Sequence, residues 1–251
     1  MLLDALCYNK RKRGAEIMET LPIIMLCLSC ALIVLFIVFR TIKGGLISVL
    51  LKALASLSLV VTAVVGLGTC ELENTTPIIL IIVGLLFGML GDILLDLKVV
   101  YDNDKVYLNS GMLSFALGHF AYFSAFTIMA LESLDFLDFS IIISIWSAIA
   151  LTFVIIVFGK KLMKLDFGNY LWQSVGYTFI LSFMVVYTML LAIFNAGSWI
   201  AMIALALFFL SDIVLSTQYF GGKLHSKPLI VINHLLYYSA QLIIAMLVFL
   251  I

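Results

Sequence analysis

Four ionisable side chains lie inside stretches that are otherwise long and apolar: Asp92, Asp96, His119 and Asp212. Ionisable groups are costly in a bilayer, so they rarely occur there unless they face a helix-bundle interior and serve a function. Asp92 and Asp96 are one helical turn apart, which puts them on one helix face. Carboxyl groups and an imidazole can divide acid–base work, one giving a proton while another stays charged. These residues predict one buried polar site.

The composition indicates which elements must position that site. The chain has 251 residues, of which 65% are hydrophobic and 11% charged, and its mean hydropathy is +1.25. A soluble domain of this size could not bury so much apolar surface, so we expect a polytopic membrane protein. The net charge is zero, which gives no electrostatic basis for binding nucleic acid. The predicted fold class is all-α, a membrane bundle of about eight transmembrane helices.

Eight apolar stretches are each long enough to cross a membrane, since ~20 helical residues span ~30 Å of hydrocarbon. They cover 21–39, 46–66, 77–97, 108–131, 139–158, 171–194, 198–220 and 229–251. Residues 21–251 are therefore expected to form a single domain. The segment 1–20 is set apart, because METLPIIML, starting at Met18, is a more ordinary opening. If synthesis starts at Met18, the preceding residues are not translated.

Basic residues are segregated among the predicted loops. The loops after spans one, three, five and seven hold Lys and Arg, whereas the other loops and the C-terminus hold none. By the positive-inside rule, the basic loops face the cytoplasm and both termini lie outside. Only Lys10–Arg13 disagrees, which again favours a start at Met18. The expected location is a multi-pass membrane protein, in the cytoplasmic membrane if the source is bacterial.

Depth unites the polar residues into one site. Counted from the basic loops at ~1.5 Å per residue, one group lies ~8–12 Å deep and another ~12–18 Å deep. The first comprises Lys52, Asp92, Tyr177 and Tyr237, and the second comprises His119, Asp212 and Gln241. The opposite half of these spans holds almost no ionisable group. The pattern predicts a polar cavity that opens toward the basic side, whereas a transport path would show polar groups through the full thickness.

Each polar residue also has a structural interpretation. Asp92 could form a structural ion pair with Lys52, and a lysine near a span end extends to the interface by default. Asp96 lies close enough to the end of its span to be solvated. A lone membrane histidine or a stripe of polar residues often serves only to form hydrogen bonds between helices. Tyr177 could merely pack. Two further sets are expected to serve packing: the glycines Gly84, Gly88 and Gly91, and the cysteines Cys27 and Cys30 as small core residues.

Four motifs occur in order: G-L-x-F-x-x-x-G-D-x-x-L at 84–95, G-x-x-x-F-x-x-x-H-x-x-Y at 111–122, S-D-x-x-L at 211–215 and Y-Y-x-A-Q at 237–241. Together they resemble the YhhN family of eight-span membrane proteins, over spans two to eight. Its characterised members include the vertebrate lysoplasmalogenases, which hydrolyse a lysoplasmalogen's vinyl ether to a fatty aldehyde and a glycerophospho-head-group. The resemblance places polar site positions at Asp92, His119, Tyr122, Asp212, Tyr237 and Gln241.

This chemistry needs an acid that can protonate carbon. Burial favours the neutral form of a carboxyl group, so one buried aspartate can hold a proton while a second stays ionised. Asp92 and Asp212 are the expected pair, with His119 orienting a carboxyl group or relaying the proton. Tyr122, Tyr237 and Gln241 are expected to place water or bind the ether oxygen. The expected substrate contacts are completed by Lys52, which with the loop cations would hold the phosphate, and by Asp96 and Tyr177.

Three alternatives stay open. His119 with two aspartates could bind zinc, although no H-x-x-x-H or H-E-x-x-H spacing occurs and no cofactor is expected. A proton- or cation-coupled transporter also uses intramembrane acids, and a non-catalytic lipid-binding protein would need only the cavity. The expected partners are a lysophospholipid substrate and membrane lipids.

Overall fold

Every long apolar stretch folds into a helix, because a helix satisfies its own backbone hydrogen bonds where water is absent. The computed structural model describes residues 2–68, 75–101, 104–131, 137–194 and 198–250, with side chains from residue 20 onward. These residues form α1 (Leu2–Ile42), α2 (Gly45–Leu67), α3 (Thr75–Val100), α4 (Asp104–Ala130), α5 (Leu137–Lys161), α6 (Leu171–Phe194), α7 (Trp199–Tyr219) and α8 (Lys227–Leu247). A short 3-10 helix, η3 (Gly168–Tyr170), precedes α6, and the described residues contain no strand.

The predicted membrane bundle is confirmed. Eight helices in the described ranges are long and apolar enough to cross a membrane, the first over Thr20–Ile42. Most begin or end within a few residues of the predicted spans. The last helix begins at Lys227, earlier than predicted, because Pro228 fits the first turn, where no intrahelical N–H bond is lost. The side chains of Cys7 and Lys10–Arg13, and all of Cys70, lie outside the described residues.

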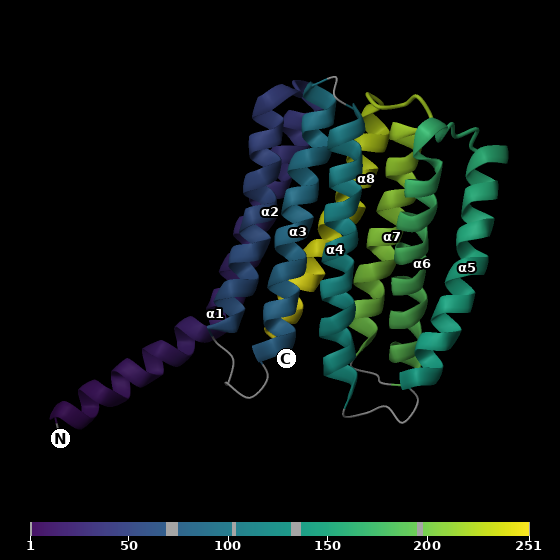
Figure 1. Ribbon diagram of the computed structural model, residues 1–251. Coiled ribbons are helices and arrows are strands. Elements are labelled where there is room, and N and C mark those ends of the chain that lie inside the picture. Colours follow the sequence, from purple (N-terminus) through teal and green to yellow (C-terminus); the bar gives the residue numbers. More distant parts are fainter. Residues whose placement is uncertain (1, 69–74, 102–103, 132–136, 195–197, 251) are drawn as a thin grey trace.

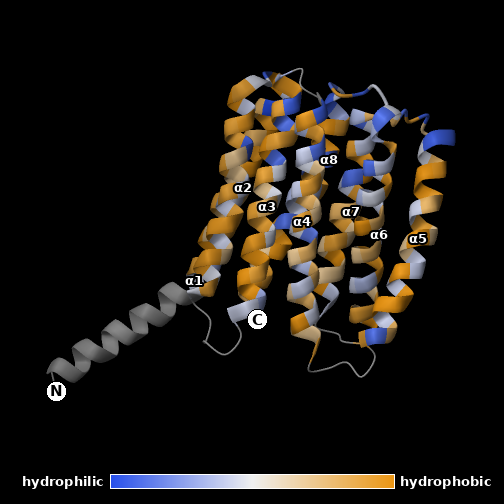
Figure 2. Cartoon of the chain, in the orientation of Figure 1, coloured by the Kyte–Doolittle hydropathy of each residue, from blue (hydrophilic) through white to orange (hydrophobic). Residues whose placement is uncertain are grey.

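The connections alternate between the two ends of the bundle (Figure 1). The basic loops between α1 and α2, α3 and α4, α5 and α6, and α7 and α8 gather at the upper end, which we call the basic end. The C-terminal end of α8 lies at the opposite end (Figure 1). Figure 2 shows hydrophilic residues in the loops at the basic end and hydrophobic residues along the spans. This arrangement matches the predicted segregation of charge.

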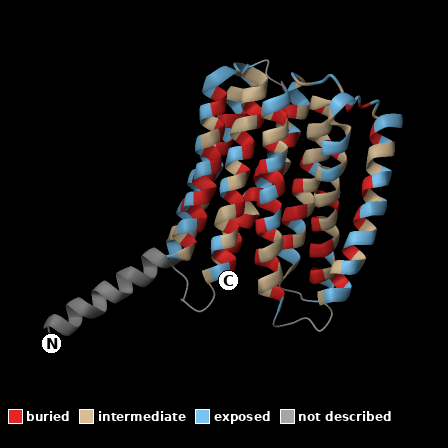
Figure 3. Cartoon of the chain, viewed as in Figure 1, coloured by how far each residue is buried: buried red, intermediate tan, exposed pale blue. Residues whose placement is uncertain are grey.

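Burial inside the bundle differs between helices (Figure 3). Within its membrane-crossing window, α2 has 56% of its residues buried, whereas α5 has only 17%. Helix α3 packs against α2, α4 and α8, while α5 packs against α6 at the edge of the bundle (Figure 1). Large apolar side chains on α5, such as Trp146 and Phe153, are exposed, as expected for residues that face lipid.

Glycines bring α3 close enough to its neighbours to build the site. A Cβ atom at Gly91 would lie 2.7 Å from the Phe115 ring of α4, and one at Gly88 would lie 2.8 Å from Gln241 Nε2 of α8. Both distances are too short for a real side chain, so these positions have room only for glycine unless the neighbours move. The predicted packing role of these small residues is confirmed. The packing brings the motif-bearing faces of α3, α4 and α8 together.

The prediction that Cys27 and Cys30 are core residues is wrong. Both side chains are exposed on α1, and neither forms a disulfide. Their helix face carries other exposed apolar residues, including Ile23 and Val34. A small thiol is apolar enough to face lipid as readily as a protein core.

Candidate active site

Asp92 on α3 is the most completely bonded carboxyl group among the described residues. Its side chain is 1% exposed. Oδ1 lies 3.2 Å from Lys52 Nζ of α2, and Oδ2 accepts hydrogen bonds from Ser56 Oγ at 2.6 Å and Tyr237 OH at 2.7 Å. A buried carboxylate is stable only when a cation and donors compensate for lost water. Asp92 thus has the cation and the donors that a buried carboxylate needs.

Lys52 and Asp96 correct two structural interpretations of the sequence. Lys52 does not extend to the interface, since it is 5% exposed and also lies 3.4 Å from Asp96 Oδ1. Asp96 is not solvated, since it is 2% exposed and also lies 3.8 Å from Arg40 Nη2 of α1. Lys52 thus lies between two carboxylates one turn apart. The ion pair of Asp92 with Lys52, proposed as the structural alternative, does exist.

A chain of hydrogen bonds connects Asp92 with α4. Tyr237 OH donates to Asp92 and accepts from Gln241 Nε2 at 3.1 Å. Gln241 Oε1 in turn accepts from Tyr122 OH of α4 at 2.9 Å. All of these side chains are buried. The network orients both hydroxyls, since Tyr122 donates to Gln241 and Tyr237 donates to Asp92, and so it preorganises a donor at that carboxylate.

Asp212 on α7 has a different environment. Its side chain is only partly buried, and Oδ2 accepts a hydrogen bond from Tyr177 OH of α6 at 2.7 Å. No ion pair involves Asp212 among the described residues. It lines one cavity together with Asp92, Asp96, Lys52 and Arg40, which we call the charged cavity. The predicted pair of aspartates therefore faces one space, with a cation beside only one of them.

The charged cavity is small and lies near the basic end. Its volume of about 20 Å³ is enough for about one water molecule. Arg40 lies in the last turn of α1, and Leu224, in the loop between α7 and α8, also lines the cavity. The polar cavity predicted from residue depth thus lies toward the predicted side. Eight further residues line it beside the charged ones and Leu224: Leu95, Phe115, Leu215, Gln218, Tyr219, Asn233, His234 and Tyr237.

His119 lies among aromatic rings. Its Nδ1 is 2.8 Å from the Phe115 carbonyl oxygen, and because a carbonyl only accepts, Nδ1 carries the proton. Nε2 is buried and has no hydrogen-bond partner in the described part of the chain. The ring packs edge-on against Phe208 at 4.6 Å and Tyr177 at 6.5 Å between centroids. His119 thus touches the tyrosine that bonds Asp212, but no described hydrogen bond joins it to either aspartate.

Sequence reasoning missed residues that complete the site. Arg40 was treated as a loop cation, although its side chain is 7% exposed and faces Asp96. Ser56 and Tyr238 were overlooked, yet their hydroxyls lie 3.1 Å apart and Ser56 bonds Asp92. The available signal was spacing, because Ser56 follows Lys52 by one helical turn and so shares its helix face.

The zinc alternative requires three ligands to meet around one point. Among the described residues, no three His, Cys, Asp or Glu side chains form such a group. Lys52, a cation, lies between Asp92 and Asp96.

One known protein family matches the part of the chain that carries the predicted site residues. The model of the YhhN family matches residues 47–248, most of the chain. The chain belongs to the YhhN family. No curated protein and no solved structure matches it at a significant level. The YhhN match covers every site residue predicted from the sequence, whereas Arg40 lies before it.

Proposed function

We propose that this YhhN-family protein is a membrane-embedded hydrolase that cleaves the vinyl ether bond of a lysoplasmalogen. The products would be a fatty aldehyde and a glycerophospho-head-group. One observation carries the proposal: Asp92 and Asp212 face one cavity in unlike environments, one beside a lysine and the other beside none. Two carboxyl groups held in different protonation states are what acid-catalysed ether cleavage requires.

Asp212 is the proposed general acid. Its proton goes to the β-carbon of the vinyl ether, whose double-bond electrons form the new C–H bond. The α-carbon then carries an oxocarbenium charge, which the Asp92 carboxylate stabilises. Lys52 serves by holding Asp92 ionised, because its two close contacts are both carboxylates. This role differs from phosphate binding, which the sequence suggested for Lys52.

Water completes the reaction. A water molecule adds to the α-carbon and loses a proton to the Asp212 carboxylate, giving a hemiacetal. The hemiacetal collapses as its hydroxyl proton passes to the leaving oxygen, which yields aldehyde and alcohol and restores the starting protonation. The charged cavity has room for about one water molecule beside both aspartates. Tyr237, fixed by Gln241 and Tyr122, would orient that water.

The remaining residues are proposed to position these groups. Tyr177 holds Asp212 by its hydroxyl, and His119 packs on Tyr177, so His119 would act through that tyrosine. Arg40 lies at the basic end, 3.8 Å from Asp96, and its buried Nε has no hydrogen-bond partner among the described residues. An arginine there suits the phosphate of a lysolipid head group, together with the loop lysines of the same end.

The test is aldehyde release by the purified protein in lipid nanodiscs. Three lysolipids that differ only in the chain linkage should be compared: vinyl ether, saturated alkyl ether and acyl ester. We expect aldehyde from the vinyl ether alone, since only a vinyl ether yields an oxocarbenium ion on protonation of carbon. Absence of aldehyde, together with proton-coupled solute uptake in liposomes, would favour a transporter instead. Lysolipid binding without turnover or transport would favour a lipid-binding protein.

A further inference from the structure

A second cavity lies between α5, α6 and α7 and is larger than the charged cavity, with a volume of about 180 Å³. Most of its wall is apolar, including Val154, Phe158, Gly159, Leu165 and Leu181. We call it the apolar chamber. We propose that the apolar chamber binds the single hydrocarbon chain of the substrate lipid and that Gly159 sets how much chain it admits. This inference rests on the proposed function.

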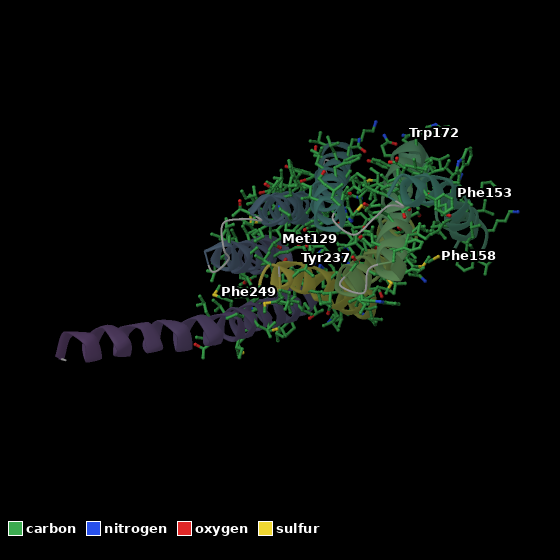
Figure 4. All side chains as sticks on the ribbon, turned by 90° about the horizontal axis from the view of Figure 1, so that it is seen from below. Met129, Phe153, Phe158, Trp172, Tyr237 and Phe249 are labelled. Carbon is green, nitrogen blue, oxygen red and sulfur yellow. The ribbon has the colours of Figure 1, made fainter. Side chains whose placement is uncertain are left out.

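The apolar chamber reaches the lipid-facing surface along α5. Val154 and Phe158 line it, yet they are 57% and 49% exposed. Figure 4 shows Phe153 and Phe158 at the outer edge of the bundle, on the far side from the first helix. Because α5 packs against α6 at the edge of the bundle, α5 leaves the chamber accessible from the side. A chain already dissolved in the membrane can therefore enter without crossing water.

A third, small cavity connects the apolar chamber with the charged cavity. It shares Met112, Tyr177 and Phe220 with the chamber, and Leu95 and Tyr219 with the charged cavity. Asp212 lines all three spaces. A chain that fills the chamber would thus end beside Asp212, with its polar end in reach of the charged residues.

This continuity identifies the occupant as an amphiphile with one chain. Lipid tails are as apolar as the chamber wall, so entry from the bilayer gains little from the hydrophobic effect. Selection must therefore come from steric fit and from alignment of the linkage with Asp212. A chain bonded directly to the head group through a vinyl ether would place that bond at the junction of apolar and charged walls, where the proposed acid lies.

Gly159 keeps the chamber open. A Cβ atom there would lie 3.2 Å from Leu165 Cδ1 and 3.7 Å from the Phe167 ring, so a longer side chain must extend into the chamber or displace its wall. Gly176 on α6 offers a matched control. It is exposed, and a Cβ atom there would meet nothing within 4 Å. Both positions are helical, so leucine changes helix propensity alike in both.

The first experiment compares Gly159→Leu with Gly176→Leu, using vinyl-ether lysolipids with octadecenyl and octenyl chains. We expect Gly159→Leu to lower kcat/KM for the long chain by ~10-fold or more, which is typical of a misfit of a few carbons in an apolar pocket. The short chain should be affected less, and Gly176→Leu should leave both unchanged. An equal loss for both chains in Gly159→Leu would overturn the role assigned to this glycine.

The second experiment does not depend on turnover or on a folded variant. A saturated alkyl-ether lysolipid carrying a diazirine in mid-chain is cross-linked to the wild-type protein and mapped by mass spectrometry. We expect adducts on Ser174, Thr178 and Leu181, which line the chamber, and an excess of unlabelled alkyl-ether lysolipid should abolish them. Adducts on the outer residues Trp146 and Phe153 should persist, because bulk lipid reaches them.

The two proposals fail in distinguishable ways. Competed adducts in the chamber without aldehyde release from a vinyl-ether lysolipid would reject the hydrolase and keep the chain site. Aldehyde release with adducts only on lipid-facing residues would keep the hydrolase and overturn the chain site.

Discussion

Asp212 lines both the charged cavity and the apolar chamber, but the two cavities differ in their lining and in how tightly their helices pack. The charged cavity lies among α1, α2, α3, α4, α7 and α8, most of its side chains are buried, and Lys52 bridges Asp92 and Asp96 within it. The apolar chamber lies at the edge of the bundle beside α5, with exposed residues in its wall. Charges in a membrane must be fixed by partners, so their helices pack closely. A hydrocarbon chain needs no polar partner, so its helices can pack loosely.

The comparison separates two functions that a lipid hydrolase must combine. Preorganised acid–base groups require rigid elements that hold donors within a fraction of an ångström. Exchange of lipid requires an element that is easily reached from the bilayer. Glycines at 88 and 91 serve the first function by closing α3 onto α4 and α8. Gly159 serves the second function by leaving space in the apolar chamber. Glycine thus allows helices to pack closely at one site and keeps a cavity open at the other.

The largest expected loss of activity comes from substituting Asp92 or Asp212, and no other acidic residue should match it. Asp92→Asn and Asp212→Asn should each lower kcat for the vinyl-ether lysolipid by ~10²–10⁴-fold, because each removes an acid–base group and keeps its shape. The double variant should be little worse, since the pair acts as a unit. Asp138→Asn, at an exposed position on α5, is the control. Near-normal turnover in either single variant would reject the two-carboxylate mechanism.

The next largest effect is a loss of stability, expected when the lysine of the charged cavity is replaced. Lys52→Met would leave Asp92 and Asp96 buried without the cation between them, which costs ~3–5 kcal/mol for a broken buried pair. We expect a clearly lowered midpoint of thermal unfolding in detergent. Lys43→Met, at an exposed lysine of the same end, should change that midpoint little. An unchanged midpoint for Lys52→Met would mean that the aspartates are neutral or solvated.

Smaller effects should distinguish the two tyrosines that bond the aspartates. Tyr237→Phe removes the donor to Asp92, and Tyr177→Phe removes the donor to Asp212. A hydrogen bond to a charged group contributes ~1.5–3 kcal/mol, so Tyr237→Phe should lower kcat/KM by ~10–100-fold. If Asp212 is the proton donor, Tyr177→Phe should cost less. Tyr187→Phe, whose hydroxyl bonds only Thr127 among the described residues, should keep full activity.

The sequence was sufficient for the fold and for the identity of the aspartates. Helix length and polarity predicted all eight spans, because the bilayer leaves few alternatives for an apolar stretch. Depth counted along each span placed Asp92 and Asp212 in neighbouring layers of the same half of the bundle, and residues in neighbouring layers of packed helices can face one cavity. Periodicity does not reveal which way a span turns about its axis, so Lys52 was expected at the interface and Arg40 in a loop.

The sequence offered the pair of Asp92 with Lys52 as one alternative, but it could not show that the lysine also contacts Asp96 and leaves Asp212 without a cation partner among the described residues. Which carboxylates receive the lysine depends on how α2 packs against α3, and the hydropathy of the two spans does not determine this. The sequence could not predict the apolar chamber either. Its wall consists of ordinary apolar residues, and only the position of α5 at the edge shows that a space is left among them.

Removing metal ions should not change turnover at all. Activity should survive exhaustive chelation, because the chemistry runs on protonation and no three candidate ligands meet among the described residues. His119 Nδ1 bonds the Phe115 carbonyl, and its ring packs against Phe208. A zinc site would need Nε2 and both aspartates ~2.0–2.2 Å from one ion, and Lys52 would then have to leave Asp92. Turnover should be measured after chelation, with metal analysis of the protein. Lost turnover that zinc restores, with one bound ion per chain, would reassign Asp92, His119 and Asp212 as ligands and join the two cavities through a metal.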